Sequence, residues 1–293
     1  MSSAEDLHFE PKKILCAVDL TPASKLVLKW ARFFADAYGA KLDVVHADYF
    51  DYPPYMLPSE SGRFVAEGEA RRSDLHRQLA ALVGDAIGML PSVELTILDG
   101  HPVEALLRRV DSSAPDMIAI GSHGHSGFSR LYLGSVAESL VRTTVAPTLV
   151  ARTRENQPVP KVGTVLCPIN FDATGHRSLQ VAAQVARMFR AQLSVLHAVD
   201  EAHFDLDASY REICQWVSPK VREQCAIVEV VRHGNPAEQI LLAAREQSTD
   251  LIVLGAERRP FFDLRILGVT AERVLRHAES SVLVLPSERE FAT

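Results

Sequence analysis

The stretch KILCAVD, residues 13–19, determines how the rest of the chain can be interpreted. Lys13–Val18 is a short, unbroken and almost wholly apolar run, which is typical of a strand covered on both faces of a sheet. Asp19 follows at its carboxyl end. A similar pattern, VLCPIN, occurs at residues 165–170, and it begins 151 residues after Ile14. The strand pattern is therefore repeated within one chain.

The repetition extends along the whole chain. Residues 40–47 (AKLDVVHA) match residues 191–198 (AQLSVLHA) at the same offset of 151 residues, and residues 116–121 (DMIAIG) match residues 250–255 (DLIVLG) at 134 residues. Two constant offsets indicate a duplicated domain. The first copy has 17 extra residues in or near Asp48–Phe64, where prolines predict an irregular aromatic loop. We expect this loop to pack on its own domain; the alternative is a flap over a ligand or partner.

Each copy alternates strands with helices. The helix expected after the first strand has Thr21 as its N-cap, Pro22 at its first position and Gly39 at its end. This alternation predicts an α/β fold with two tandem, doubly wound, five-stranded parallel-sheet domains, residues 1–154 and 155–293. The other elements expected in the first copy are strands at Leu42–Ala47, Val93–Leu98, Met117–Ile120 and Thr148–Ala151, and helices at Arg71–Ile87, Pro102–Val110 and Ser135–Arg142.

Composition narrows the class of protein. Hydrophobic residues make up 47% of the chain and charged residues 23%, as in a globular protein. A net charge of −6 argues against nucleic acid as the main partner. The four cysteines are too few for a disulfide scaffold, and Cys16 and Cys167 are expected in the core. Without a signal-peptide pattern or a long apolar run, we expect a cytoplasmic protein with no membrane partner.

A glycine-rich loop follows one of the expected buried strands. Residues 121–135 read GSHGHSGFSRLYLGS. Three glycines in seven residues let backbone N–H groups approach a ligand. Gly134 and Ser135 then open a helix, whose free N–H groups and positive dipole end suit a phosphate. Since ligands of doubly wound sheets bind outside the carboxyl ends of the strands, the pattern indicates a phosphate cradle there.

The spacing Gly-x2-Gly-x9-Gly-Ser resembles the ATP-binding motif of the universal stress protein family, and the resemblance extends over both halves. It implies two Rossmann-like domains related by a pseudo-two-fold axis, with ATP, with or without Mg, as the ligand. It also implies that the last strands, residues 147–151 and 281–285, pair within the chain; a further homodimer stays open. The residues it assigns to the nucleotide are Ala17, Asp19, Ala47, Gly121, Gly124, His125, Ser126, Gly127, Gly134, Ser135 and Val136.

The second copy departs from this motif. Arg258 stands in place of the second glycine, Val269 in place of the serine and Asn170 in place of the aspartate. We therefore predict that the C-terminal half does not bind ATP in the manner of the family; the alternative is an anion held by Arg258 and Arg259. In the first copy, His125 occupies a position that is often basic in the family, which weakens the expected phosphate affinity.

The function that follows is a non-enzymatic, ATP-binding stress-response regulator acting on an unidentified protein partner. One alternative is an interaction or scaffold protein with a secondary nucleotide site, and another is an ATP-cleaving enzyme. Asp19 alone is weak evidence for catalysis, so no catalytic residue is assigned, although slow hydrolysis stays open. His123 and His125 lack a third ligand, so no metal site is assigned. His46 and His197, at equivalent strand ends, are expected to be structural.

Overall fold

The computed structural model describes residues 8–49, 61–88, 91–122, 133–152, 159–199, 205–256 and 267–286. The first half contains β1 (Lys13–Ala17), α1 (Ser24–Tyr38), β2 (Lys41–Asp48), α2 (Ser61–Ile87), β3 (Val93–Asp99), α3 (Pro102–Ser113), β4 (Met117–Gly121), α4 (Ser135–Thr143) and β5 (Thr148–Ala151). The second half contains β6 (Thr164–Pro168), α5 (Ala173–Phe189), β7 (Gln192–Val199), α6 (Leu206–Trp216), α7 (Pro219–Arg222), β8 (Ile227–His233), α8 (Pro236–Glu246), β9 (Leu251–Ala256), α9 (Val269–His277) and β10 (Ser281–Pro286). The predicted boundary between residues 154 and 155 lies outside the described residues.

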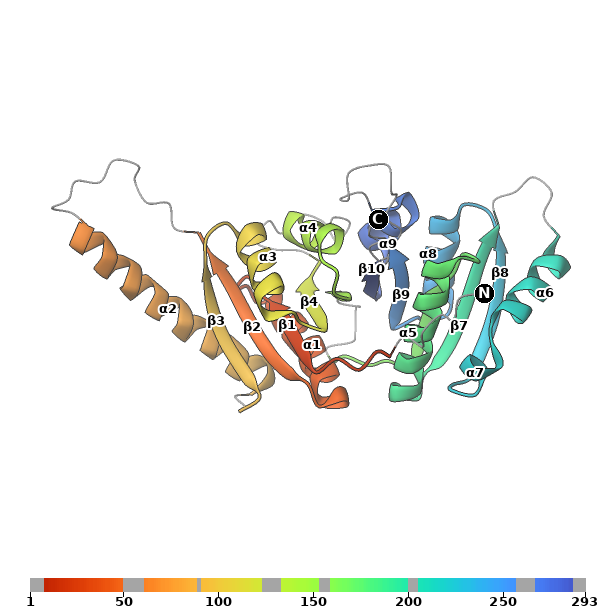
Figure 1. Cartoon of the computed structure of the whole chain (residues 1–293), viewed down its shortest axis with the longest axis horizontal. Coiled ribbons are helices and arrows are strands. Elements are labelled where there is room, and N and C mark those ends of the chain that lie inside the picture. The colour runs from red at the N-terminus through yellow and green to blue at the C-terminus, as the bar shows by residue number, and fades with distance from the viewer. Residues whose placement is uncertain are drawn as a thin grey trace, which may run out of the picture.

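One sheet runs through both halves (Figure 1). Its ten strands have the order β3-β2-β1-β4-β5-β10-β9-β6-β7-β8. The strand pairs within each half are parallel, whereas β5 and β10 pair antiparallel at the junction. The α/β class and the two parallel, five-stranded halves are therefore confirmed. The intramolecular pairing of the last strands is confirmed as well.

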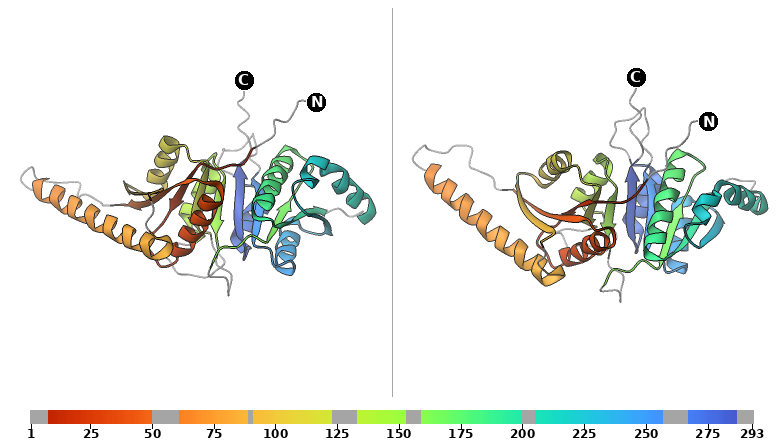
Figure 2. Two further views of the ribbon diagram at one scale, coloured as in Figure 1. Left: turned by 90° about the horizontal axis from the view of Figure 1, so that it is seen from below. Right: turned by 60° about the horizontal axis from the view of Figure 1, so that its bottom comes forward.

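Helices cover both faces of this sheet (Figure 2). Because alternate residues of a strand point to opposite faces, β1 contributes to two cores. Ile14 and Cys16 belong to the core covered by α1, α2, α5, α6 and α7, while Leu15 and Ala17 belong to the core covered by α3, α4, α8 and α9. Burial raises the pKa of the Cys16 thiol, so this cysteine stays protonated as a small core residue, as predicted.

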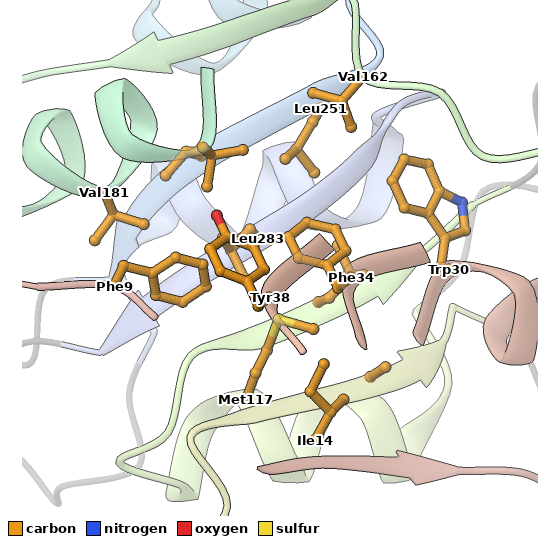
Figure 3. Close-up of a cluster of buried hydrophobic side chains, with 14 of the residues drawn as sticks. Phe9, Ile14, Trp30, Phe34, Tyr38, Met117, Val162, Val181, Leu251 and Leu283 are labelled. Atoms are coloured by element: carbon orange, nitrogen blue, oxygen red, sulfur yellow. The ribbon is translucent and has the colours of Figure 1, made fainter. Parts of the chain in front are cut away.

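The two halves share one aromatic core on the α1 and α5 face. Phe33 of α1 stacks on Phe189 of α5 with ring centroids 4.6 Å apart. Figure 3 shows Phe34 and Tyr38 of α1 in the same buried cluster as Leu283 of β10. The segment before β1 adds to the contact between the halves, because the Phe9 backbone N–H donates to Gln184 Oε1 of α5 at 2.8 Å. The junction is therefore a continuous core rather than a flexible linkage.

The start of α1 differs from the prediction. The helix begins at Ser24, two residues after Pro22, and its N-cap position is Ala23. Thr21 does not cap it, because the Thr21 hydroxyl donates to Asp19 Oδ1 at 2.6 Å. A turn with hydrogen bonds between residues three apart occupies the intervening segment. The end of the helix is as predicted, with Gly39 in the left-handed conformation at φ 65°.

The expected irregular loop at Asp48–Phe64 is only partly correct. Helix α2 begins at Ser61, so its first turn lies inside the range in which we expected no regular structure. It is 27 residues long, whereas α6, α7 and their connection span residues 206–222. More than half of the extra length of the first copy is therefore helical. Residues 50–60, which carry most of the predicted aromatic loop, lie outside the described residues.

Helix α2 projects beyond the sheet (Figures 1 and 2). Its side chains from residue 66 to residue 78 are nearly all exposed, so the core does not hold this part. Arg71 makes a bidentate ion pair with Asp48, at the end of β2, with both N···O distances 2.7 Å. None of the helices in the described ranges is both long and apolar enough to span a membrane.

Replacing Phe189 by alanine should destabilise the chain by about 2–4 kcal/mol, because Phe189 contacts Phe33, Phe34 and Tyr38 across the junction. Urea denaturation measures this loss. Met188→Ala is the matched control, because Met188 precedes Phe189 in the chain and its side chain is 43% exposed. Equal effects of the two substitutions would contradict a shared aromatic core.

The tether between Asp48 and α2 should depend on pH. The Arg71 guanidinium holds the pKa of Asp48 below its usual value of 3.8. A depressed carboxyl pKa stabilises the fold above the unfolded-state pKa, and this contribution is lost as pH falls through the folded-state pKa. Asp48→Asn should therefore cost about 0.5–1 kcal/mol at pH 7 and almost nothing at pH 2. Paired urea titrations at both pH values test this, and an equal cost at both would refute it.

Candidate functional site

A cavity of about 450 Å³ opens at the carboxyl ends of the first-half strands. The tips of β1, β2 and β4 form its base, and the first turns of α1, α3 and α4 form its walls. This is the position at which doubly wound sheets bind ligands. The lining residues are Ala17, Val18, Asp19, Ala23, Ser24, Leu26, Val27, Val45, His46, Ala47, Pro102, Leu106, Ile120, Gly121, Ser122, Gly134, Ser135, Val136, Ala137 and Ala151.

Asp19 shapes the rim of the cavity beside α1. Its Oδ1 atom accepts hydrogen bonds from the Thr21 backbone N–H at 3.1 Å and from the hydroxyls of Thr21 and Ser24 at 2.6 Å each. The Asp19 N–H in turn donates to Ser24 Oγ at 3.1 Å. This carboxylate therefore holds the turn between β1 and α1 and keeps the entrance of the cavity in one shape.

His46 has the structural role that was predicted for it. Its Nδ1 lies 2.9 Å from the Val18 carbonyl oxygen, and because a carbonyl only accepts, Nδ1 carries the proton. The equivalent His197 makes the same bond to the Ile169 carbonyl at 3.1 Å. In both halves the imidazole thus ties the second strand of the half to the end of the first.

The N-terminus of α4 forms the opposite wall. Gly134 is its N-cap and has no side-chain hydrogen bond there. Ser135, Val136 and Ala137, the first three helical residues, all line the cavity. An α-helix leaves the N–H groups of its first turn without partners inside the helix, and its N-terminus carries a partial positive charge. This wall therefore favours an anionic group.

Charged side chains contribute little to the described lining. Asp19 is the one carboxylate among the described lining residues, and these residues include neither lysine nor arginine. An anion bound to these residues would be stabilised by backbone N–H groups and by the α4 dipole rather than by a cationic side chain. The floor is largely apolar, with Val45, Leu106 and Ile120 among its members. The site thus combines an apolar region for a ring system with a polar wall for an anion.

The structure brings seven of the eleven candidate residues to this cavity: Ala17, Asp19, Ala47, Gly121, Gly134, Ser135 and Val136. Gly124, His125, Ser126 and Gly127 lie outside the described residues, as does His123. Sequence reasoning missed the apolar contributions of Leu26 and Leu106. The spacing of Pro102 and Leu106 by one helical turn, directly after a predicted strand, was the available signal.

In the second half, two side chains of α5 lie against the end of β9. Helix α5 begins at Ala173, where Asp172 caps it by accepting from the Gly175 N–H at 2.7 Å. Thr174 and Ser178 then lie against Gly255, because a Cβ on that glycine would meet Thr174 Cγ2 at 2.5 Å and Ser178 Oγ at 2.7 Å.

By the repeat, the first-half counterparts of Thr174, Ser178 and Gly255 are Ala23, Val27 and Gly121. All three counterparts line the cavity of the first half. Thr174 is larger than its counterpart Ala23, whereas Ser178 is smaller than its counterpart Val27, and both Ser178 and Val27 are buried. Val269, which replaces the serine of the motif, is 71% exposed. Arg258 and Arg259 lie outside the described residues.

Metal binding finds no support within the described part of the chain. No group of three or more histidine, cysteine, aspartate or glutamate side chains there is arranged to hold a metal ion.

Comparison with known proteins identifies related chains over almost the full length. Residues 10–152 and 161–286 each match the model of the universal stress protein family. A universal stress protein of Mycobacterium tuberculosis is 27% identical over 237 residues, which cover 80% of this chain and 82% of that protein.

One universal stress protein of Thermus aquaticus is 31% identical over 141 residues, which cover 48% of this chain and 98% of that protein. The crystal structure of a universal stress protein from Archaeoglobus fulgidus superposes with a TM-score of 0.71 at 20% identity. It covers 95% of this chain and 99% of that one. The two-domain architecture is thus found in a solved relative.

Proposed function

The chain belongs to the universal stress protein family, and from this premise we propose that its N-terminal half binds one adenine nucleotide, ATP, and acts as a non-enzymatic regulator. The observation that carries the proposal is the cavity at the strand ends. It joins the first turn of α4 to the motif residues Gly121, Gly134 and Ser135 and to an apolar floor.

The residues present fit the parts of a nucleotide. The apolar floor around Val45, Leu106 and Ile120 suits an adenine ring. Asp19 at the tip of β1 is the candidate partner of the ribose hydroxyls, as the family motif implies. The N–H groups of Ser135 and Val136, with the glycine motif, are the candidate phosphate ligands. A volume of about 450 Å³ falls in the range of small-molecule sites.

The cavity offers little for catalysis. A general base needs a free lone pair within reach of the attacking water. Asp19 Oδ1 already accepts three hydrogen bonds that hold the turn between β1 and α1. The described lining brings no second carboxylate or cationic side chain to the site. We therefore infer that ATP is held rather than cleaved, and that it acts by favouring one conformation of the chain over another.

The site is proposed for one half only. In the second half Thr174 and Ser178 occupy the end of β9, and the serine that would begin α9 is replaced by Val269. Arg258 in place of the second glycine and Asn170 in place of the aspartate separate the second half further from the motif. The second half then serves pairing within the chain and contact with a protein partner.

Isothermal titration of the full chain with ATP should give one site per chain. Ala47→Trp should abolish this binding, because Ala47 lines the cavity and an indole would fill it. Ala198→Trp is the matched control, since Ala198 lies 151 residues later at the same position of the second copy. It should leave affinity and stoichiometry unchanged. Two sites per chain, or loss of binding in the Ala198 variant, would contradict a single N-terminal site.

ATP incubated with the full chain and Mg²⁺ should be recovered uncleaved. The assay is phosphate release with the protein in excess over nucleotide, so that even a single turnover is detected. Ala47→Trp identifies hydrolysis by a contaminant, because such activity would persist in that variant. Phosphate release that disappears with Ala47→Trp would show an enzyme instead of a binding protein.

A further inference from the structure

Helix α4 faces two parts of the molecule at once. Its first residues, Ser135 to Ala137, line the cavity of the first half. Further along the same helix, Glu138 and Arg142 contact α9 of the second half. Since an α-helix of nine residues moves as a rigid unit, a force on its later turns also displaces its N-terminus.

The contact between these helices is a ring of four charges. Arg142 Nη2 lies 2.8 Å from Glu138 Oε1 within α4 and 3.3 Å from Glu272 Oε2 on α9. Arg276 Nη2 lies 2.9 Å from Glu272 Oε1 within α9 and 3.2 Å from Glu138 Oε2 on α4. Each charge therefore has one partner on its own helix and one on the other helix. We call these four residues the ionic ring.

Two features distinguish the ionic ring from an ordinary surface ion pair. Its side chains are only 23% to 33% exposed, so water screens them less than it screens a free surface pair. The ring is also symmetric, because Glu272 and Arg276 follow Glu138 and Arg142 at the repeat offset of 134 residues. The second copy keeps these charges although it has lost the serine of the nucleotide motif.

A second contact joins the cavity wall to the same helix. Ala151 at the end of β5 lines the cavity, and Arg152 follows it directly. Arg152 is 8% exposed, and its guanidinium donates to the carbonyl oxygens of Leu275 and Arg276 in the last turn of α9. Carbonyls at a helix C-terminus attract a cation. Two elements of the cavity wall, α4 and β5, are thus both fastened to α9.

We propose that Glu272 and Arg276 of the second half are positioning residues for the nucleotide site of the first half. This proposal rests on the proposed function. The ionic ring holds α4 against α9, so the N–H groups of Ser135 and Val136 are already oriented when a phosphate arrives. Without the ring, α4 has more freedom, and nucleotide binding must offset the entropy of ordering it.

Loss of the ionic ring should affect the phosphates of a bound nucleotide and its adenine ring differently. The ring acts on α4, which is the phosphate wall, and it does not touch the apolar floor that would receive the adenine ring. Loss of the ring should therefore weaken the binding of ATP more than that of adenosine. A general loss of structure would weaken both ligands together, which makes this difference the decisive measurement.

The test is titration of the full chain with ATP and with adenosine. Glu272→Gln combined with Arg276→Gln should weaken ATP binding about three- to tenfold, in the range of couplings between separated sites. Adenosine binding should change less than twofold, roughly the lower limit of a resolvable coupling. Urea denaturation of the same samples shows whether the variant is folded.

A charge exchange tests the ring without deleting it. Glu272→Arg alone places a third cation beside Arg142 and Arg276, and should weaken ATP binding further. Adding Arg142→Glu restores opposite charges between the helices and should recover most of the affinity. Glu279→Gln is the control, because it breaks the ion pair of Glu279 with Arg245 just beyond α9 without touching α4.

The outcomes distinguish this inference from the proposed function. If the unmodified chain binds no ATP, the proposed function fails. If it binds ATP and the ring variants, well folded, bind it equally tightly, the positioning role alone is overturned. Equal losses for ATP and adenosine, no recovery on charge exchange, or the same loss with Glu279→Gln would also overturn it.

Discussion

The antiparallel pairing of β5 with β10 is the interaction on which the rest of the structure depends. Leu149 lies opposite Leu283, and both are fully buried at the centre of the sheet. Without this pairing each half would expose a largely hydrophobic edge strand, and exposed edges of that kind promote aggregation. The pairing also brings α4 beside α9 and α1 beside α5, and so makes the aromatic core and the ionic ring. A single strand register thus sets the geometry of the whole junction.

The two halves keep one fold and differ where a ligand would bind. The imidazoles of His46 and His197 make the same hydrogen bond to the preceding strand, so the frame of each half is the same. The first helix of each half differs. In the first half a turn held by Asp19 delays α1 until Ser24, whereas in the second half Asp172 starts α5 at Ala173. Thr174 in the first turn of α5 lies against Gly255 at the end of β9.

Much of the fold could be predicted from the sequence, because strands buried on both faces appear as apolar runs. The repeat shows each of these patterns twice. The unbroken apolar run at residues 13–18, the alternation of strands with helices and the constant offsets predict a parallel sheet in each half. The cap at Thr21 was wrong because Asp19 competes for its hydroxyl, a contact that depends on the three-dimensional turn. The start of α2 was placed at Arg71 instead of Ser61, because nearby prolines, which end at Pro58, suggested a longer irregular segment than exists.

Seven candidate site residues gather at one cavity because strand ends and helix starts are the positions that a sequence pattern locates well. The contact of Thr174 and Ser178 with Gly255 could not be predicted in the same way, since it depends on how α5 packs on β9. The most direct test of the central claim is to denature protein purified without added ligand and identify released small molecules by mass spectrometry. About one adenine nucleotide per chain is the expected result. Two per chain, or none together with no binding on titration, would contradict a single nucleotide site in the N-terminal half.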